Sequence, residues 1–163
     1  MKSLFAKTKE SYDGTQLRSL FGYMEYGLLG DSVIAWIGPC SVSFDHMVDG
    51  EDLRAEAKIQ GEQMVHFIIE LFDRDLFAAV NVQRLLASIV MEHLRKLSKN
   101  EKLRREGDDI YLDDKKLASP LPPFHRFPRS FISPSTSSTT AHLCPHFVCK
   151  ISKWNPTNLS KIF

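Results

Sequence analysis

One segment near residue 110 carries the strongest structural signal in the chain. It reads Gly107-Asp108-Asp109-Ile110-Tyr111-Leu112-Asp113-Asp114-Lys115-Lys116-Leu117-Ala118. The apolar and aromatic run Ile110–Leu112 is typical of a short strand, and Asp113-Asp114 is typical of a tight turn. Lys115 to Ala118 would then form the returning strand. The segment therefore predicts a β-hairpin.

Upstream of the hairpin, the apolar residues recur every three or four positions. From Asp75 to Leu97 this period predicts a long amphipathic helix, with Asp73 or Asp75 capping its start. The residues that define the pattern are Val82, Leu86, Ile89, Val90, His93 and Leu97. The charged residues from Lys99 to Glu106 are expected to connect this helix to the hairpin.

Two strands are predicted ahead of the helix. Val33 to Ile37 is a continuous apolar run ended by Gly38-Pro39, which is typical of a buried strand, and Val65 to Phe72 alternates like a second strand. A short strand at Ser3 to Ala6 and a short helix capped by Thr15 are expected before them. The apolar side of that helix would consist of Leu17, Leu20, Phe21 and Met24. The order of elements predicts an α+β fold with a mixed or antiparallel sheet.

The hairpin resembles that of biotin- and lipoate-protein ligases, which also place an apolar strand and a long helix just ahead of it. Residues 1 to 118 are more closely similar to the family called domain of unknown function 366. The segments that carry this similarity are the hairpin, Gly27-Leu28-Leu29-Gly30-Asp31-Ser32, Gly38-Pro39-Cys40, Met64-Val65-His66-Phe67-Ile68-Ile69-Glu70 and Gln83-Arg84-Leu85-Leu86. The resemblance implies the fold shared by biotin and lipoate ligases and class II synthetases.

By the same resemblance, Lys116 is the catalytic lysine that contacts an acyl-adenylate, and ATP with Mg²⁺ is the cofactor. A cation there stabilises charge on the α-phosphate and the activated carboxyl. Asp108 stands where the ligases have asparagine and Asp109 matches their aspartate. The added negative charge near a nucleotide requires compensation by Mg²⁺ or by Arg104 and Arg105. The alternative is that Lys116 is an exposed hairpin residue and that the two aspartates belong to a loop.

His66 and Arg84 are further candidate substrate-binding residues. His66 would face a ligand from its strand, and Arg84 would reach an anionic ligand from the helix. Each also has a structural interpretation, as a hydrogen-bonded histidine at the edge of the core and as a solvated or paired arginine. Cys40 lacks a partner base at a recognisable spacing and is interpreted as a small buried residue. Residues 1 to 118 contain no Gly-Arg-rich phosphate loop, which counts against ordinary ligase activity.

The 163-residue chain is divided unevenly in composition. Residues 1 to 118 hold all 20 acidic residues. Residues 119 to 163 hold no acidic residue but seven of the eight prolines. This predicts a globular domain over 1–118 and a disordered tail over 119–163, and the resemblance implies that the domain is ligase-like but incomplete. The net charge of +1 argues against a dedicated nucleic-acid binder. No apolar run has the length of a membrane span, so a cytoplasmic protein without membrane contact is expected.

Two further interpretations concern the tail. His142, Cys144, His146 and Cys149 are metal-ligand types, but they form one crowded cluster without the second, separated half of a zinc site, so no metal is predicted. Reading the gene one base earlier from Ser119 allows strands, a turn and acidic residues to return. A frameshift is therefore the preferred interpretation of the tail. The ligase-like fold would then be missing its C-terminal strands.

The sequence leads to two functional hypotheses for the ligase-like domain, and the alternative to both is a metal-binding tail on an unrelated domain. The first is ATP-dependent, adenylate-forming acyl transfer, inactive in this chain because the closing strands are missing. The second is a non-catalytic module on the same fold that binds a nucleotide or a small acid. The expected partner is a small-molecule or acyl substrate. The acyl acceptor and the oligomeric state are not indicated by any pattern.

Overall fold

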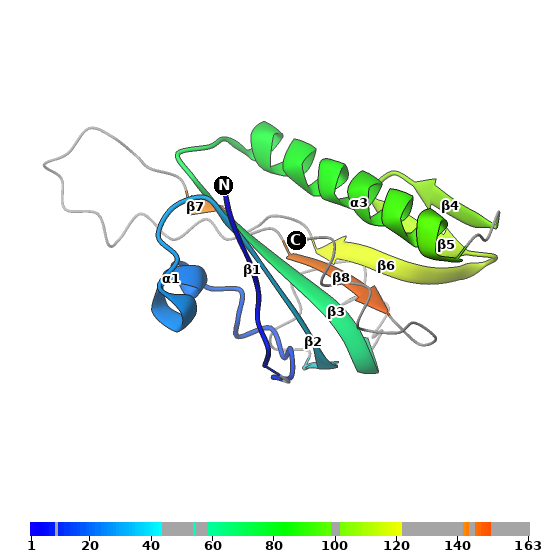
Figure 1. The fold of residues 1–163 in the computed structure, drawn as a ribbon, viewed down its shortest axis with the longest axis horizontal. Helices are drawn as coiled ribbons and strands as arrows, with labels where there is room; N and C mark the ends of the chain where they lie inside the picture. Colours follow the sequence, from blue (N-terminus) through cyan, green and yellow to red (C-terminus); the bar gives the residue numbers. More distant parts are fainter. Residues whose placement is uncertain are drawn as a thin grey trace, which may run out of the picture.

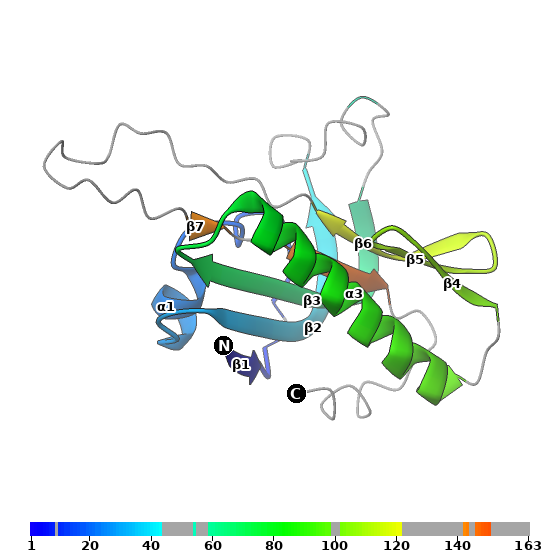
Figure 2. The same ribbon diagram turned by 90° about the horizontal axis from the view of Figure 1, so that it is seen from above.

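A computed structural model describes residues 1–8, 10–43, 54, 59–98, 102–121, 142–143 and 146–150. The helices with described bounds are α1 (Phe21–Tyr26) and α3 (Leu76–Ser98). The strands are β1 (Lys2–Phe5), β2 (Ser32–Val42), β3 (Ile59–Phe72), β4 (Leu103–Glu106), β5 (Asp109–Leu112), β6 (Lys115–Leu121), β7 (His142–Leu143) and β8 (His146–Lys150). Figures 1 and 2 show α3 lying across one face of the sheet that these strands form.

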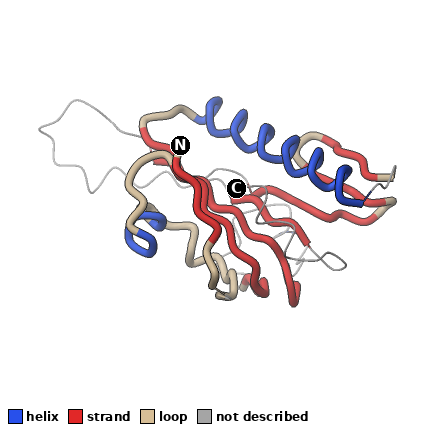
Figure 3. The backbone as a smooth tube through the Cα atoms, in the orientation of Figure 1, coloured by secondary structure: helices blue, strands red, loops and turns tan. Residues whose placement is uncertain are grey.

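The described strands make one sheet in the order β1-β2-β3-β8-β6-β5-β4, with β7 pairing with β3 off this path. β1 pairs with β2 in parallel, and every other described pair is antiparallel. The predicted α+β class with a mixed sheet is therefore confirmed. Figure 3 shows the two long strands, β2 and β3, running side by side through this sheet.

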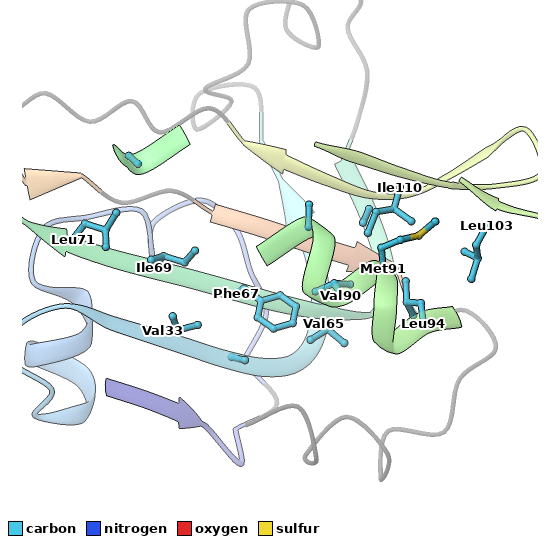
Figure 4. Close-up of a cluster of buried hydrophobic side chains, with 14 residues drawn as sticks. Val33, Val65, Phe67, Ile69, Leu71, Val90, Met91, Leu94, Leu103 and Ile110 are labelled. Atoms are coloured by element: carbon cyan, nitrogen blue, oxygen red, sulfur yellow. The ribbon is translucent and has the colours of Figure 1, made fainter. Parts of the chain in front are cut away.

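The sheet has a hydrophobic core on each face. Alternate residues of β3, namely Val65, Phe67, Ile69 and Leu71, point toward α3 and pack with α3 residues such as Val90, Met91 and Leu94 (Figure 4). On the opposite face, Ile68 belongs to a second core with Trp36 and Phe21. Because β2 and β3 are covered on both sides, Val33 to Ile37 can be continuously apolar, as the sequence predicted.

The long helix and the hairpin also follow the prediction. α3 starts after Asp75, whose Oδ1 accepts a hydrogen bond from the Ala78 amide at 2.7 Å, so Asp75 rather than Asp73 is the N-cap. β5 and β6 form the hairpin around Asp113, which takes a left-handed φ of 53°. Aspartate tolerates this conformation better than most residues.

Several predicted boundaries were wrong, and one of them is the start of β3, which lies at Ile59 rather than at Val65. β2 continues through Pro39 to Val42, because a register shift between Gly38 and Cys40 accommodates a residue that cannot donate to the ladder. The short helix starts at Phe21 rather than after Thr15, since Leu20 adopts a left-handed φ of 60°. The charged connector contains β4, which pairs with β5.

The helix before β2 also differs from the prediction in its buried side. Leu17 and Phe21 are buried, whereas Leu20 and Met24 are exposed. Because α1 is shorter than predicted and starts later, these four residues do not form one continuous apolar face.

The tail also differs from the prediction that it supplies no strand. β6 crosses residue 118 and ends at Leu121, and β8 lies between β3 and β6. The five residues of β8 contain no proline, so every backbone amide in it can donate, although the tail as a whole is rich in proline. The expected disorder concerns the rest of the tail, which lies outside the described residues, as does Cys144 of the histidine and cysteine cluster.

Candidate functional site

A β-bulge in the hairpin turns Lys116 away from α3. Ile110 pairs with Ala118, but the next residue, Tyr111, pairs with Lys116, so Leu117 is an extra residue on β6. Such a bulge shifts the alternation of side chains by one. Ile110 and Ala118 are accordingly in the core beneath α3, while Lys116 lies with Tyr111 on the opposite face of the sheet.

Lys116 is paired with a carboxylate on that face. Its Nζ lies 2.9 Å from Oδ2 of Asp109, with the lysine side chain 47% exposed and the aspartate 24%. The Tyr111 hydroxyl donates to the same Oδ2 at 3.4 Å. An ion pair this exposed contributes about 0–1 kcal/mol to stability. The lysine can therefore leave it for an anionic ligand at small cost.

β4 adds a second cation to the same face. Arg104 pairs in register with Tyr111, and Glu106 pairs with Asp109. The guanidinium carbon of Arg104 lies 4.5 Å from the centre of the Tyr111 ring, and the side chain forms an ion pair with Glu106. We call these five residues, Arg104, Glu106, Asp109, Tyr111 and Lys116, the charged face.

Sequence reasoning proposed Arg104 only as a compensating charge and did not find Tyr111 as a site residue. The signal that was available is the two-residue alternation of the hairpin, which can be extended backwards into β4. It was missed because Lys99 to Glu106 was interpreted as a connector.

The predicted site residues do not all come together. Asp108 is half-buried in the turn between β4 and β5, directly before Asp109. Arg84 is exposed on α3, on the other side of the sheet from Lys116. His66 shares the sheet face of Lys116 but is fully buried. The structure thus pairs Lys116 with Asp109, places Asp108 next to Asp109 only along the chain, and separates them from His66 and Arg84.

His66 lies between two aromatic rings. Its ring centroid is 5.3 Å from that of Tyr12 and 4.9 Å from that of Trp36, and both contacts are stacked. Its Nε2 donates to the Gly38 carbonyl at 3.2 Å. Burial lowers the pKa of His66 to about 4, although hydrogen bonds to the Gly38 and Pro39 backbone oppose this shift. The imidazole is therefore neutral near pH 7.

The neighbouring titratable groups are also held neutral. Burial raises the pKa of the Cys40 thiol to about 11, which removes the thiolate required of a nucleophile. Burial likewise raises the pKa of Tyr12, and the nearby Cys40 and Asp13 raise it further. The buried cluster of His66, Cys40 and Tyr12 is thus suited to packing rather than to acid–base chemistry.

Within the described ranges, no group of three or more His, Cys, Asp or Glu side chains is arranged to hold a metal ion. Nor does any helix in those ranges combine the length and apolar character needed to cross a membrane.

The architecture is that of an α+β domain whose long helix covers one face of a mixed sheet and whose charged hairpin lies near one edge. The chain belongs to the family described as domain of unknown function 366, whose model matches residues 1–143. This match extends beyond residue 118, where the sequence similarity was expected to end.

Two further proteins are similar to this chain at 33% identity. An uncharacterised protein of Methanocaldococcus jannaschii is 33% identical over 123 residues, which cover 72% of this chain and 55% of that protein. The chain thus spans little more than half the length of this relative. A solved protein of unknown function from Pyrococcus horikoshi is 33% identical, with a TM-score of 0.75, over 93% of this chain and 73% of that one.

A weaker likeness is to LipL1 of P. falciparum, solved in complex with lipoate. It has a TM-score of 0.45 and 10% identity, and the match covers 98% of this chain and 50% of that one.

Proposed function

We propose that this domain binds a carboxylic acid and ATP and supports formation of an acyl-adenylate, with Lys116 as the stabilising cation. The observation that carries the proposal is the orientation of Lys116. The bulge places it on the face away from α3, half-exposed and next to Asp109, in a hairpin whose sequence resembles that of biotin and lipoate ligases.

In the proposed reaction a carboxylate oxygen of the acid attacks the α-phosphorus of ATP. The new oxygen–phosphorus bond forms as the bond from that phosphorus to the bridging oxygen breaks, and pyrophosphate leaves with the electron pair. Negative charge grows on the α-phosphate oxygens during this step. An ammonium group beside them lowers the barrier, because it interacts more strongly with the transition state than with the free acid.

Magnesium would be bound mainly by the ATP phosphates, because Mg²⁺ usually takes only one or two protein carboxylates and keeps several waters. Asp109 offers such a carboxylate beside Lys116, and Asp108 precedes it in the chain. Magnesium supplies charge neutralisation of the phosphates in this chemistry. The Lys116–Asp109 pair itself holds the cation at the site before a ligand arrives.

A second candidate function is binding without catalysis. It is favoured by the Asp109 carboxylate, which already neutralises Lys116 and competes with an anionic ligand. Binding without catalysis also agrees with the sequence of residues 1 to 118. Gly27–Gly30 has no basic residue, and no Gly-Arg-rich loop occurs elsewhere in this segment. In this case nucleotides or short acids would raise the melting temperature without turnover.

ATP–pyrophosphate exchange in the presence of octanoate, lipoate or biotin tests the first function. The assay is applied to this chain and to a version in which residues from 119 onward are replaced by the restored-frame sequence. We expect carboxylate-dependent exchange from the restored version, and exchange from the present chain as well would show that β8 closes the sheet without the restored residues. Lys116→Ala should lower the exchange rate by about 100-fold, as expected for loss of one charge-stabilising group.

Lys115→Ala is the matched control. Lys115 is also exposed, but it pairs with Leu112 and therefore lies on the other face of the hairpin. The exchange rate should be unchanged in this variant. If the restored version shows no carboxylate-dependent exchange, or if both lysine variants lose activity equally, acyl-adenylate formation at Lys116 is ruled out.

A further inference from the structure

The charged face contains two cations on one side of the hairpin, separated by an aromatic ring. We propose that Arg104, stacked on Tyr111, is a phosphate-binding group that acts together with Lys116 and takes the place of the missing Gly-Arg-rich loop. This inference rests on the proposed function, which it deepens by assigning the phosphate contacts of the nucleotide.

The first argument is the way in which Arg104 is held. Its guanidinium lies over the Tyr111 ring at 4.5 Å, and its side chain keeps substantial exposure to solvent. An arginine stacked on an aromatic ring has its plane fixed while its N–H edges stay available. A guanidinium oriented in this way can donate two parallel hydrogen bonds to a phosphate.

The second argument is spacing. Arg104 pairs with Tyr111 on β4 and β5, and Tyr111 pairs with Lys116 on β5 and β6. Neighbouring strands are about 4.8 Å apart, so the Cα atoms of the two cations lie roughly 10 Å from each other. Their long side chains can close part of this gap over Tyr111. A ligand with two or more linked phosphates can contact both cations, whereas a single carboxylate contacts only one.

The third argument concerns charge balance. Glu106 pairs with Arg104 and Asp109 pairs with Lys116, so each cation on this face has an acidic neighbour in the described structure. Binding of a polyphosphate would exchange these exposed ion pairs for pairs with the ligand. Because exposed ion pairs are weak and screened by salt, the exchange is feasible and the affinity should fall as salt is added.

The test is calorimetric titration of the full chain with sodium pyrophosphate and, separately, with octanoate. Arg104→Ala should weaken pyrophosphate binding about tenfold or more and leave octanoate binding unchanged, because one charge-assisted contact is worth roughly that factor. Arg104→Lys should be intermediate, since it keeps the charge but loses the planar fork. Tyr111→Leu should weaken pyrophosphate binding through loss of the stacked position.

Arg105→Ala is the matched control for charge. Arg105 is also exposed, but it pairs with Ile110 and so lies on the α3 side of β4, where it donates to the Gly107 carbonyl at 2.7 Å. Its replacement removes the same charge from the adjacent position without altering the charged face.

The inference would be overturned if Arg104→Ala and Arg105→Ala lowered the affinity for pyrophosphate equally. It would also be overturned if the unmodified chain did not bind pyrophosphate. Neither outcome decides the proposed function, which depends on carboxylate-dependent exchange and on Lys116. If Arg104→Ala does not fold, Arg104→Lys gives the decision. Unchanged pyrophosphate affinity in that variant would mean that the guanidinium makes no specific contact.

Discussion

His66 shows how a single polar residue can be held in the core of this protein. It is fully buried between Tyr12 and Trp36, and its Nε2 donates to a backbone carbonyl. Its role as a substrate contact stays a prediction. The closed surroundings instead favour the structural interpretation, in which the imidazole packs as a flat ring and satisfies the Gly38 carbonyl near the β2 bulge.

The lowered pKa of His66 makes the stability of the protein depend on pH. The unfolded chain binds a proton near pH 6.5, but the folded chain binds it only near pH 4. The part of the stability that depends on a neutral His66 is therefore fully present above pH 6.5 and is lost as the pH falls from 6.5 toward 4. The size of this loss is about 3 kcal/mol, from roughly 1.4 kcal/mol per pKa unit.

Urea unfolding between pH 4.5 and 8 measures this dependence. His66→Phe should flatten the pH dependence in this window, because phenylalanine fills the aromatic stack without titrating. His93→Gln, on α3, should keep the full dependence. A His66→Phe protein that still loses stability between pH 6.5 and 4.5 as the parent does would show that another group is responsible.

At the scale of elements, α1 is a short helix fixed at both ends and on its inner side. Leu20 and Gly27, with φ of 60° and 67°, bound its six residues. The Gly22 amide donates to Oε2 of Glu70 at 2.9 Å, and this carboxylate is fully buried on β3. This hydrogen bond to a buried side chain attaches α1 to the sheet more firmly than the length of the helix alone would allow.

Gly22→Ala is expected to destabilise the protein, although alanine is the better helix former. An added Cβ would lie 2.6 Å from Oε2 of Glu70 and 2.8 Å from Cδ1 of Ile34. Overpacking of this kind costs about 1–3 kcal/mol and outweighs a propensity gain of up to about 1 kcal/mol. Thermal unfolding should show a lower midpoint. Met24→Ala, on the exposed side of α1, should change stability by less than about 0.5 kcal/mol.

At the scale of the whole molecule, the sheet consists of two halves joined by one strand. β1, β2 and β3 come from the first part of the chain and β4, β5 and β6 from a later part, and β8 pairs with both β3 and β6. Without β8, the edges of β3 and β6 that face each other would carry unpaired backbone groups.

Hydrogen exchange measures whether β8 is present in solution. We expect the backbone amides of residues 146–150 to be protected, because β8 pairs with a strand on each side. The amides of β3 provide the internal reference. Exchange of residues 146–150 at the rate of an unfolded chain would instead support the disordered, frameshifted tail that the sequence suggested.

The sequence predicted those parts of the fold whose signals are local. The α3 period, its aspartate cap and the hairpin turn each depend on residues within a few positions of one another. The extension of β2 through Pro39 could not be predicted in this way, because it depends on pairing with residues of β3 that are distant in sequence. The pairing of β4 with β5 is local, but it was missed because Lys99 to Glu106 was interpreted as a connector. Lys116 was found from the resemblance of the hairpin to that of the ligases, whereas the stacking of Arg104 on Tyr111 was missed because β4 was not recognised as a strand.

The extra residue at Leu117 has a consequence for how related chains can vary in length. Residues 116 and 118 face opposite sides of the sheet because Leu117 has no partner on β5. A relative that lacks this one position could keep both neighbours paired as they are, with the lysine outward and the alanine inward. Loss of any other residue between 115 and 118 would disturb one of those two pairings. Deletion of residue 117 is thus the change in length that disturbs the strand pairing of this hairpin least.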